Sequence, residues 1–117
     1  MSEDKKSKAL KMIIAIVQRG KADTPVNAAI KAGAPAATVF FGRGQGMRER
    51  LGILGVAVQP EKEIIFVILE EWLVDQVLAA MVKAGHLDKP GIGFVFVVPV
   101  DRAVGFVEAE ELAKSSA

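Results

Sequence analysis

The chain has 117 residues, 51% of them hydrophobic, and a formal net charge of +1. This length suits one domain, and the near-neutral charge creates no global field that would favour nucleic acid or a membrane surface. Cysteine and tyrosine are absent and His86 is the single histidine, which excludes disulfides, thiolate chemistry, tyrosine modification and a multi-histidine metal site within one chain. We expect a cytoplasmic protein, because the N-terminus shows no cleavable signal pattern and Leu10–Val17 is too short to span a bilayer.

The first part of the chain predicts a strand, a helix and a second strand. Ala9–Gln18 is rich in Ile and Met and is typical of a buried strand. Thr24 followed by Pro25 predicts an N-cap and a first-turn proline, and Gly33 predicts the end of that helix. Thr38–Phe41, which is β-branched and aromatic, predicts the second strand.

A long glycine-rich segment follows. Gly42–Gly55 contains five glycines and three arginines, a composition that predicts a loop. Loops of this length inside a compact domain are usually functional or mobile. The third strand is expected to begin at Val56–Val58 and to continue through Ile64–Leu69.

The last part of the chain predicts a second helix, a second glycine loop and a fourth strand. Glu70-Glu71 favour a helix N-terminus, and Gly85 is expected to end that helix. His86 is interpreted as a cap near the helix end and not as a ligand or base. The helix carries an apolar stripe formed by Leu73, Val74, Val77, Leu78, Met81 and Val82. A glycine loop is expected at His86–Gly93 and the fourth strand at Phe94–Val100. Glu108–Lys114 is expected to add a last helical turn or two.

This order, β-α-β-loop-β-α-β, predicts a ferredoxin-like α+β fold, with two helices on one face of a four-stranded antiparallel sheet. Three of the strand runs are apolar without alternation: Leu10–Val17, Ile64–Leu69 and Phe94–Val100. Such runs indicate burial on both faces. Two helices can cover only one face, so we expect the other face to pack against further copies in a closed ring, with Ile14 and Val97 pointing inward.

Several residues could bind an anion. Gly44, Gly46, Gly91 and Gly93 could form backbone N–H nests for phosphate, or could simply turn the chain. Arginines of the long loop could bind phosphate or keep the loop solvated, and Lys62 could contact phosphate or pair with a neighbouring carboxylate. Asp101-Arg102 could be a local turn or an intersubunit ion pair. Because no nucleophile and base can be paired, the sequence predicts a binding protein and not an enzyme.

Three segments carry a resemblance to a known family: T-V-F-F-G-R-G-Q-G at Thr38–Gly46, L-E-E-W-L-V-D at Leu69–Asp75 and P-G-I-G-F-V-F-V-V-P-V-D-R at Pro90–Arg102. With the long loop between them, the chain resembles the PII signal-transduction (nitrogen regulatory protein P-II) family from about Leu10 to about Phe106. The resemblance implies a homotrimer with inward-facing sheets and a mobile T-loop that docks onto target proteins. It also implies adenine-nucleotide sites (ATP, ADP or AMP) in the clefts between subunits. Proteins of this kind commonly control membrane transporters or enzymes of nitrogen and carbon metabolism.

The resemblance also assigns roles to residues and segments. Residues 1–8 are expected to be a flexible N-terminus, 9–107 the PII-like domain with its long loop at about 42–58, and 108–117 a tail. The residues expected to line the nucleotide are Thr38, Gly44, Gly46, Arg48, Lys62, Gly91, Ile92, Gly93 and Arg102. The residues expected to contact a partner are Arg43, Arg48, Arg50, Leu51 and Ile53.

The chain departs from the family pattern where cations normally hold a triphosphate. Phe94 stands in place of a lysine, and Gly105 and Val107 in place of two arginines. Ile65 stands where an acidic residue helps to recognise the base, and the absence of tyrosine precludes uridylylation at the usual position. Two alternatives remain: a trimeric metal- or stress-response protein resembling the divalent-cation tolerance family, which shares this fold, and a structural adaptor without a ligand.

Overall fold

The computed structural model describes residues 7–44 and 61–107. The expected flexible N-terminus up to residue 6, the start of the third strand at 56–58 and the tail at 108–117 lie outside these residues. So do five of the candidate site residues: Gly46, Arg48, Arg50, Leu51 and Ile53.

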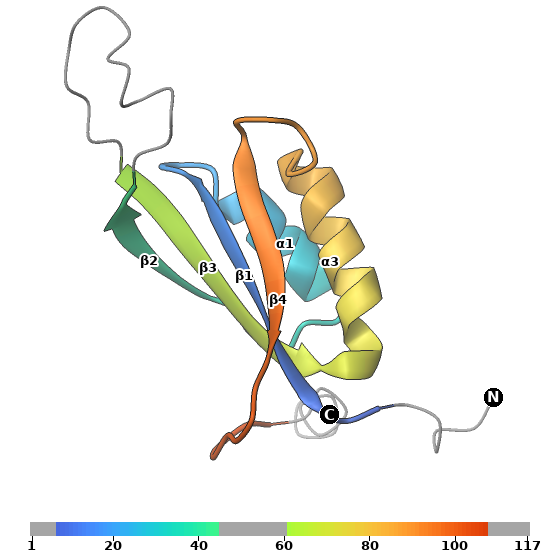
Figure 1. Cartoon of the computed structure of the whole chain (residues 1–117). Coiled ribbons are helices and arrows are strands. Elements are labelled where there is room, and N and C mark those ends of the chain that lie inside the picture. Colours follow the sequence, from blue (N-terminus) through green and yellow to red (C-terminus); the bar gives the residue numbers. More distant parts are fainter. Residues whose placement is uncertain (1–6, 45–60, 108–117) are drawn as a thin grey trace, which may run out of the picture.

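Four strands form one sheet in the order β2-β3-β1-β4, and every neighbouring pair is antiparallel. Both helices lie on the same face of this sheet (Figure 1). The ferredoxin-like arrangement is therefore confirmed. The elements in chain order are β1 (Leu10–Gln18), α1 (Asp23–Lys31), β2 (Thr38–Arg43), β3 (Glu61–Glu70), α3 (Glu71–Gly85) and β4 (Gly93–Pro99).

The core lies between the sheet and the helices. Alternate residues of the two central strands point into it and are buried, while α1 contributes Ala29 and α3 contributes the predicted apolar stripe. Burial of these side chains is the main favourable term for the fold. The strand and helix residues that are fully or almost fully buried include Ile13, Ala15, Val17, Ile65, Val67, Leu69, Leu73, Val77 and Met81.

Neither helix of the described residues lies on the opposite face of the sheet (Figure 1). We call it the open face, and it carries the other alternate residues of the strands: Met12, Ile14, Ile16, Phe40, Ile64, Phe66, Ile68, Phe94, Phe96 and Val98. The rings of Phe40 and Phe66 meet edge to face, with centroids 4.9 Å apart. Three large side chains of this face remain well exposed, namely Ile68 (36%), Phe40 (42%) and Phe94 (63%).

The register corrects one expectation about the open face. Ile14 lies on it, between Phe66 of β3 and Phe96 of β4. Val97 does not, because it pairs with Ile13, whose side chain is fully buried on the helix side. Val97 packs against the core. Its neighbour Phe96 lies on the open face instead, and the sequence alone could not tell these two positions apart.

Helix α1 begins differently from the prediction. Thr24 is not the N-cap, because the helix already starts at Asp23 and Ala22 is the cap residue, without any side-chain cap bond. A carboxylate from β3 takes this role: Glu63 Oε1 accepts hydrogen bonds from the backbone N–H groups of Gly20 (2.7 Å) and Ala22 (3.2 Å). An acceptor with negative charge is favourable at a helix N-terminus.

The predicted end of α1 is confirmed. Gly33 adopts φ +116°, the left-handed conformation that favours glycine. Its N–H donates to the carbonyl of Ile30, and the N–H of Ala34 donates to the carbonyl of Ala29, both at about 3 Å. These two bonds form a Schellman motif, which satisfies carbonyls that the helix would otherwise leave unpaired.

Helix α3 starts after the buried Glu70, whose carboxylate accepts a hydrogen bond from Trp72 Nε1 at 2.9 Å. Trp72 also packs against the core. At the other end, Gly85 is the last helical residue and not the left-handed stop. That conformation is adopted by His86 (φ 54°), whose N–H donates to the carbonyl of Val82. The interpretation of His86 as a helix cap is therefore confirmed.

Candidate functional site

One candidate wall lies where β2 ends and β3 begins. Gly42 pairs with Lys62 across these strands, and a Cβ atom on Gly44 would lie 3.5 Å from Lys62 Cγ. Lys62 belongs to the open face, while the flanking acidic residues are on the helix side of β3. There Glu63 binds the turn before α1, and Glu61 forms an ion pair with Arg19 at 3.3 Å. The wall therefore combines a lysine side chain with glycine backbone.

The second candidate wall is the glycine loop before β4. Gly91 turns the chain at φ +81°, and the N–H of Ile92 donates to the carbonyl of Lys89 at 3.3 Å. A Cβ atom on Gly93 would lie 2.9 Å from both the carbonyl oxygen of Ile16 and Leu87 Cδ2. Gly93 is thus required for close packing, and the amide of Ile92 is already bound inside the loop. These observations favour the turn-forming interpretation of the loop over a phosphate nest.

The two walls lie at the same end of the sheet but at opposite edges, as β2 and β4 are its outer strands (Figure 1). Three inter-strand spacings separate them, about 14 Å. One chain therefore does not bring Gly44 and Lys62 together with Gly91, Ile92 and Gly93.

Two other candidates lie away from both walls. Thr38 begins β2, six residues before Gly44, and is exposed. Arg102 follows β4 at the other end of the sheet, where its side chain is 93% exposed and its Nε lies 3.8 Å from Asp101 Oδ2. Arg43, the described member of the predicted partner-binding group, ends β2 opposite Glu61 and is exposed.

The resemblance places Ile65 where the family has an acidic residue that helps to recognise the base. Ile65 is fully buried and pairs with Ala15 on the helix side of the sheet. It cannot face the same space as Lys62, which points to the other side of β3. Ile65 is therefore a core residue on the helix side of β3.

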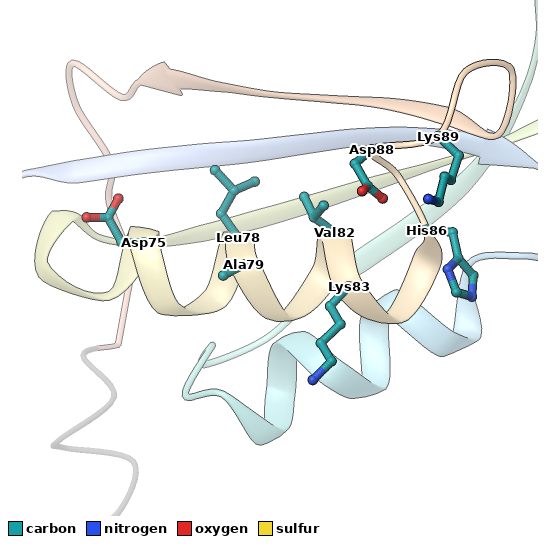
Figure 2. A pocket seen from close by; sticks show the side chains of 8 residues that line it. All are labelled: Asp75, Leu78, Ala79, Val82, Lys83, His86, Asp88 and Lys89. Atoms are coloured by element: carbon teal, nitrogen blue, oxygen red, sulfur yellow. The ribbon is translucent and has the colours of Figure 1, made fainter.

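Sequence reasoning did not predict a groove beside α3, which has a volume of about 640 Å³ (Figure 2). Its floor is apolar and its rim is charged with both signs. Side chains at helical spacing on α3 form it together with the loop that follows, a combination that only the tertiary fold reveals. The lining residues are Asp75, Leu78, Ala79, Val82, Lys83, His86, Asp88 and Lys89.

Residues 7–44 and 61–107 hold neither a cluster of metal-ligating side chains nor a membrane-spanning helix. No three His, Cys, Asp or Glu side chains in these ranges gather as they would around a metal ion. None of the helices there is long and apolar enough to cross a membrane.

The arrangement of the elements defines a small ferredoxin-like α+β domain whose glycine-bearing connections meet one end of the sheet. Residues 10–110 match the family described as Nitrogen regulatory protein P-II, so the chain belongs to that family. The predicted resemblance is confirmed. Membership places the chain among regulatory proteins.

Proposed function

We propose that this protein is a PII-like regulator that senses an adenine nucleotide at clefts between subunits of a homotrimer. It controls a partner, either a transporter or a metabolic enzyme, through the long segment at about 42–58. Membership of the P-II family supports the regulatory role. The observation that carries the finer proposal is the position of the two candidate walls on the sheet.

The open face supplies the reason for assembly. It carries large apolar side chains on all four strands, and no element of the described chain covers it. Large exposed apolar surfaces mark interaction sites. Cyclic assembly through a head-to-tail contact closes after a fixed number of copies and buries such a surface on every copy.

The same assembly brings the two walls together. When the ring axis runs roughly along the strands, the β2 edge of one copy meets the β4 edge of the next at the same height. Gly44 and Lys62 of one subunit then face Gly91 and Ile92 of its neighbour, and the site exists only in the assembled protein. Arg43 ends β2 where the long segment leaves the sheet, on the helix side opposite Glu61.

The long segment leaves the sheet after β2 and returns at Glu61, the first residue of β3, so its two ends lie beside the proposed effector site. An effector bound at this point contacts the two ends of the segment, and a change in the order of a loop is a physically sufficient switch for partner binding.

Assembly is tested by light scattering after size exclusion. The wild type is expected at three times the chain mass of 12.5 kDa. Ile14→Asp places a charge on the open face and should dissociate the trimer, because a charge without a partner is strongly disfavoured in an apolar interface. Ile30→Asp is the matched control, since Ile30 is exposed on α1. A wild-type monomer, or a trimer that tolerates Ile14→Asp, would contradict the ring.

Ligand binding is tested by calorimetric titration with ATP, ADP, AMP and cyclic AMP. Binding is expected for the trimer and should be lost in Ile14→Asp together with the assembly. If a monomeric variant still binds, the site does not lie between subunits. If the wild type gives neither heat nor a thermal shift with any of the four nucleotides, the effector belongs to another class.

A further inference from the structure

The wall contributed by β4 is aromatic. Ile92 is 42% exposed and Phe94 63% exposed, and the Phe94 ring contacts that of Phe96 with centroids 5.4 Å apart and planes tilted by 37°. Phe94 is the first open-face residue of β4 and stands directly after the glycine loop. It therefore lies at the rim of the open face, beside the proposed cleft, while Phe96 lies one step further inside and supports it.

This wall offers little to a phosphate. The amide of Ile92 is bound to the carbonyl of Lys89, and Gly93 is packed against β1. The cation of the loop, Lys89, lines the groove beside α3 on the helix side of the sheet (Figure 2). Bringing a phosphate against an exposed phenyl ring removes its water without supplying a donor, which is unfavourable.

The wall contributed by β2 and β3 is cationic. Lys62 lies on the open face beside Gly44, whereas Arg43 pairs with Glu61 and belongs to the helix side of β2. Lysine and arginine are the side chains that bind phosphate oxygens through charge-assisted hydrogen bonds. The two walls therefore differ in character, one suited to an anionic group and the other to a planar ring.

We infer that the cleft selects a nucleoside monophosphate over a triphosphate, with the base stacked on Phe94 and its single phosphate at Lys62. This inference rests on the proposed function. An exposed aromatic ring binds the face of any base. A triphosphate would have to place additional charges along a cleft in which, among the described residues, the cation comes from Lys62 on one wall.

The experiment is calorimetric titration of the full-length chain with AMP and ATP, for the wild type and three variants. The wild type should bind AMP at least as tightly as ATP. Phe94→Ala should weaken AMP binding by about tenfold, as expected for the loss of one base–aromatic stack. Phe94→Lys should shift the preference toward ATP by about tenfold, because it adds a charged donor to the second wall.

Phe41→Ala is the matched control. Phe41 is similarly exposed at 66%, but it lies on the helix side of β2, away from the cleft. It should leave the affinities for AMP and ATP unchanged. Light scattering of each variant confirms that the trimer is retained.

Three results would overturn the inference. The first is a wild type that binds ATP at least tenfold more tightly than AMP. The second is Phe94→Ala with unchanged nucleotide affinities, in which case Phe94 is a subunit contact only. Both leave the proposed function standing. The third is a wild type that binds neither nucleotide, which removes the proposed nucleotide site and this inference with it.

Discussion

Replacing Glu63 tests whether a side chain from β3 supports the start of α1. Its Oε1 accepts two backbone hydrogen bonds, from Gly20 at 2.7 Å and Ala22 at 3.2 Å. Gly20 is exposed, so water can replace the carboxylate there. Ala22 is 1% exposed, so its N–H would lose its acceptor without gaining water. Leaving a buried donor unpaired costs about 1–3 kcal/mol.

We therefore expect Glu63→Ala to lower the free energy of unfolding by about 2 kcal/mol, and Glu63→Gln, which keeps an acceptor without charge, by about half as much. Glu61→Ala is the matched control. Glu61 lies two residues earlier on the same side of β3, and its pair with Arg19 joins two well-exposed side chains, which contributes at most about 0.5 kcal/mol.

The assay is urea unfolding at one fixed protein concentration, combined with amide hydrogen exchange at Ala22. Glu63→Ala should move the midpoint without changing the slope, and should speed exchange at Ala22. If Glu63→Ala and Glu61→Ala lose the same stability, or if exchange at Ala22 is unaffected, the carboxylate does not support the helix start.

Three further predictions concern the helix ends and the glycine loop. His86→Gly should raise the unfolding free energy by up to about 1 kcal/mol in urea melts, because glycine adopts φ 54° without strain. Gly93→Ala should lower the melting temperature, since its Cβ would lie 2.9 Å from a carbonyl oxygen of β1. The hydrogen bond from Ser7, and the hydrogen bond and charge of Lys11, lower the pKa of the Glu71 carboxyl. The stability that Glu71 adds is therefore present above its unfolded pKa and is lost as the pH falls through the folded pKa; Glu71→Gln should remove this component from a pH series of melts.

Each of these three predictions has an opposite outcome that refutes its reasoning. A less stable His86→Gly would mean that the imidazole contributes more than the left-handed backbone costs. An unchanged Gly93→Ala would mean that β1 and β4 separate easily at this point. Melts of Glu71→Gln and of the wild type with the same pH dependence would mean that the contacts of Glu71 do not persist in solution.

The strand order and the end of α1 could be predicted because they depend on local signals. Continuous apolar runs mark strands, and a glycine such as Gly33 marks a helix end because it adopts the left-handed conformation needed there. The faces of those strands could not be assigned, because a run such as Phe94–Val100 has no polar residue to mark one side. Val97 was placed on the wrong face for that reason.

The start of α1 and the roles of the glycines depend on contacts distant in sequence. The acceptor at Ala22 comes from Glu63, 41 positions away, and no local pattern encodes it. Gly93 looks like a loop glycine in the sequence, but a side chain is excluded there by the close approach of β1 and Leu87. Of the candidate site, the sequence predicted the two glycine segments, and the fold added that they lie at one end of the sheet.

The division of β1 into two faces has a consequence for how its substitutions behave in solution. Changes at Ile13, Ala15 and Val17 disturb contacts within one chain, so their effect on unfolding is the same at every protein concentration. Changes at Ile14 and Ile16 alter the open face, which no other part of residues 7–44 and 61–107 covers. In the proposed ring their effect on unfolding follows mass action: it is absent in the dilute monomer and grows to a constant value as the protein is concentrated. A dilution series would thus distinguish substitutions on the two faces of β1, even at neighbouring residues, without any structural measurement.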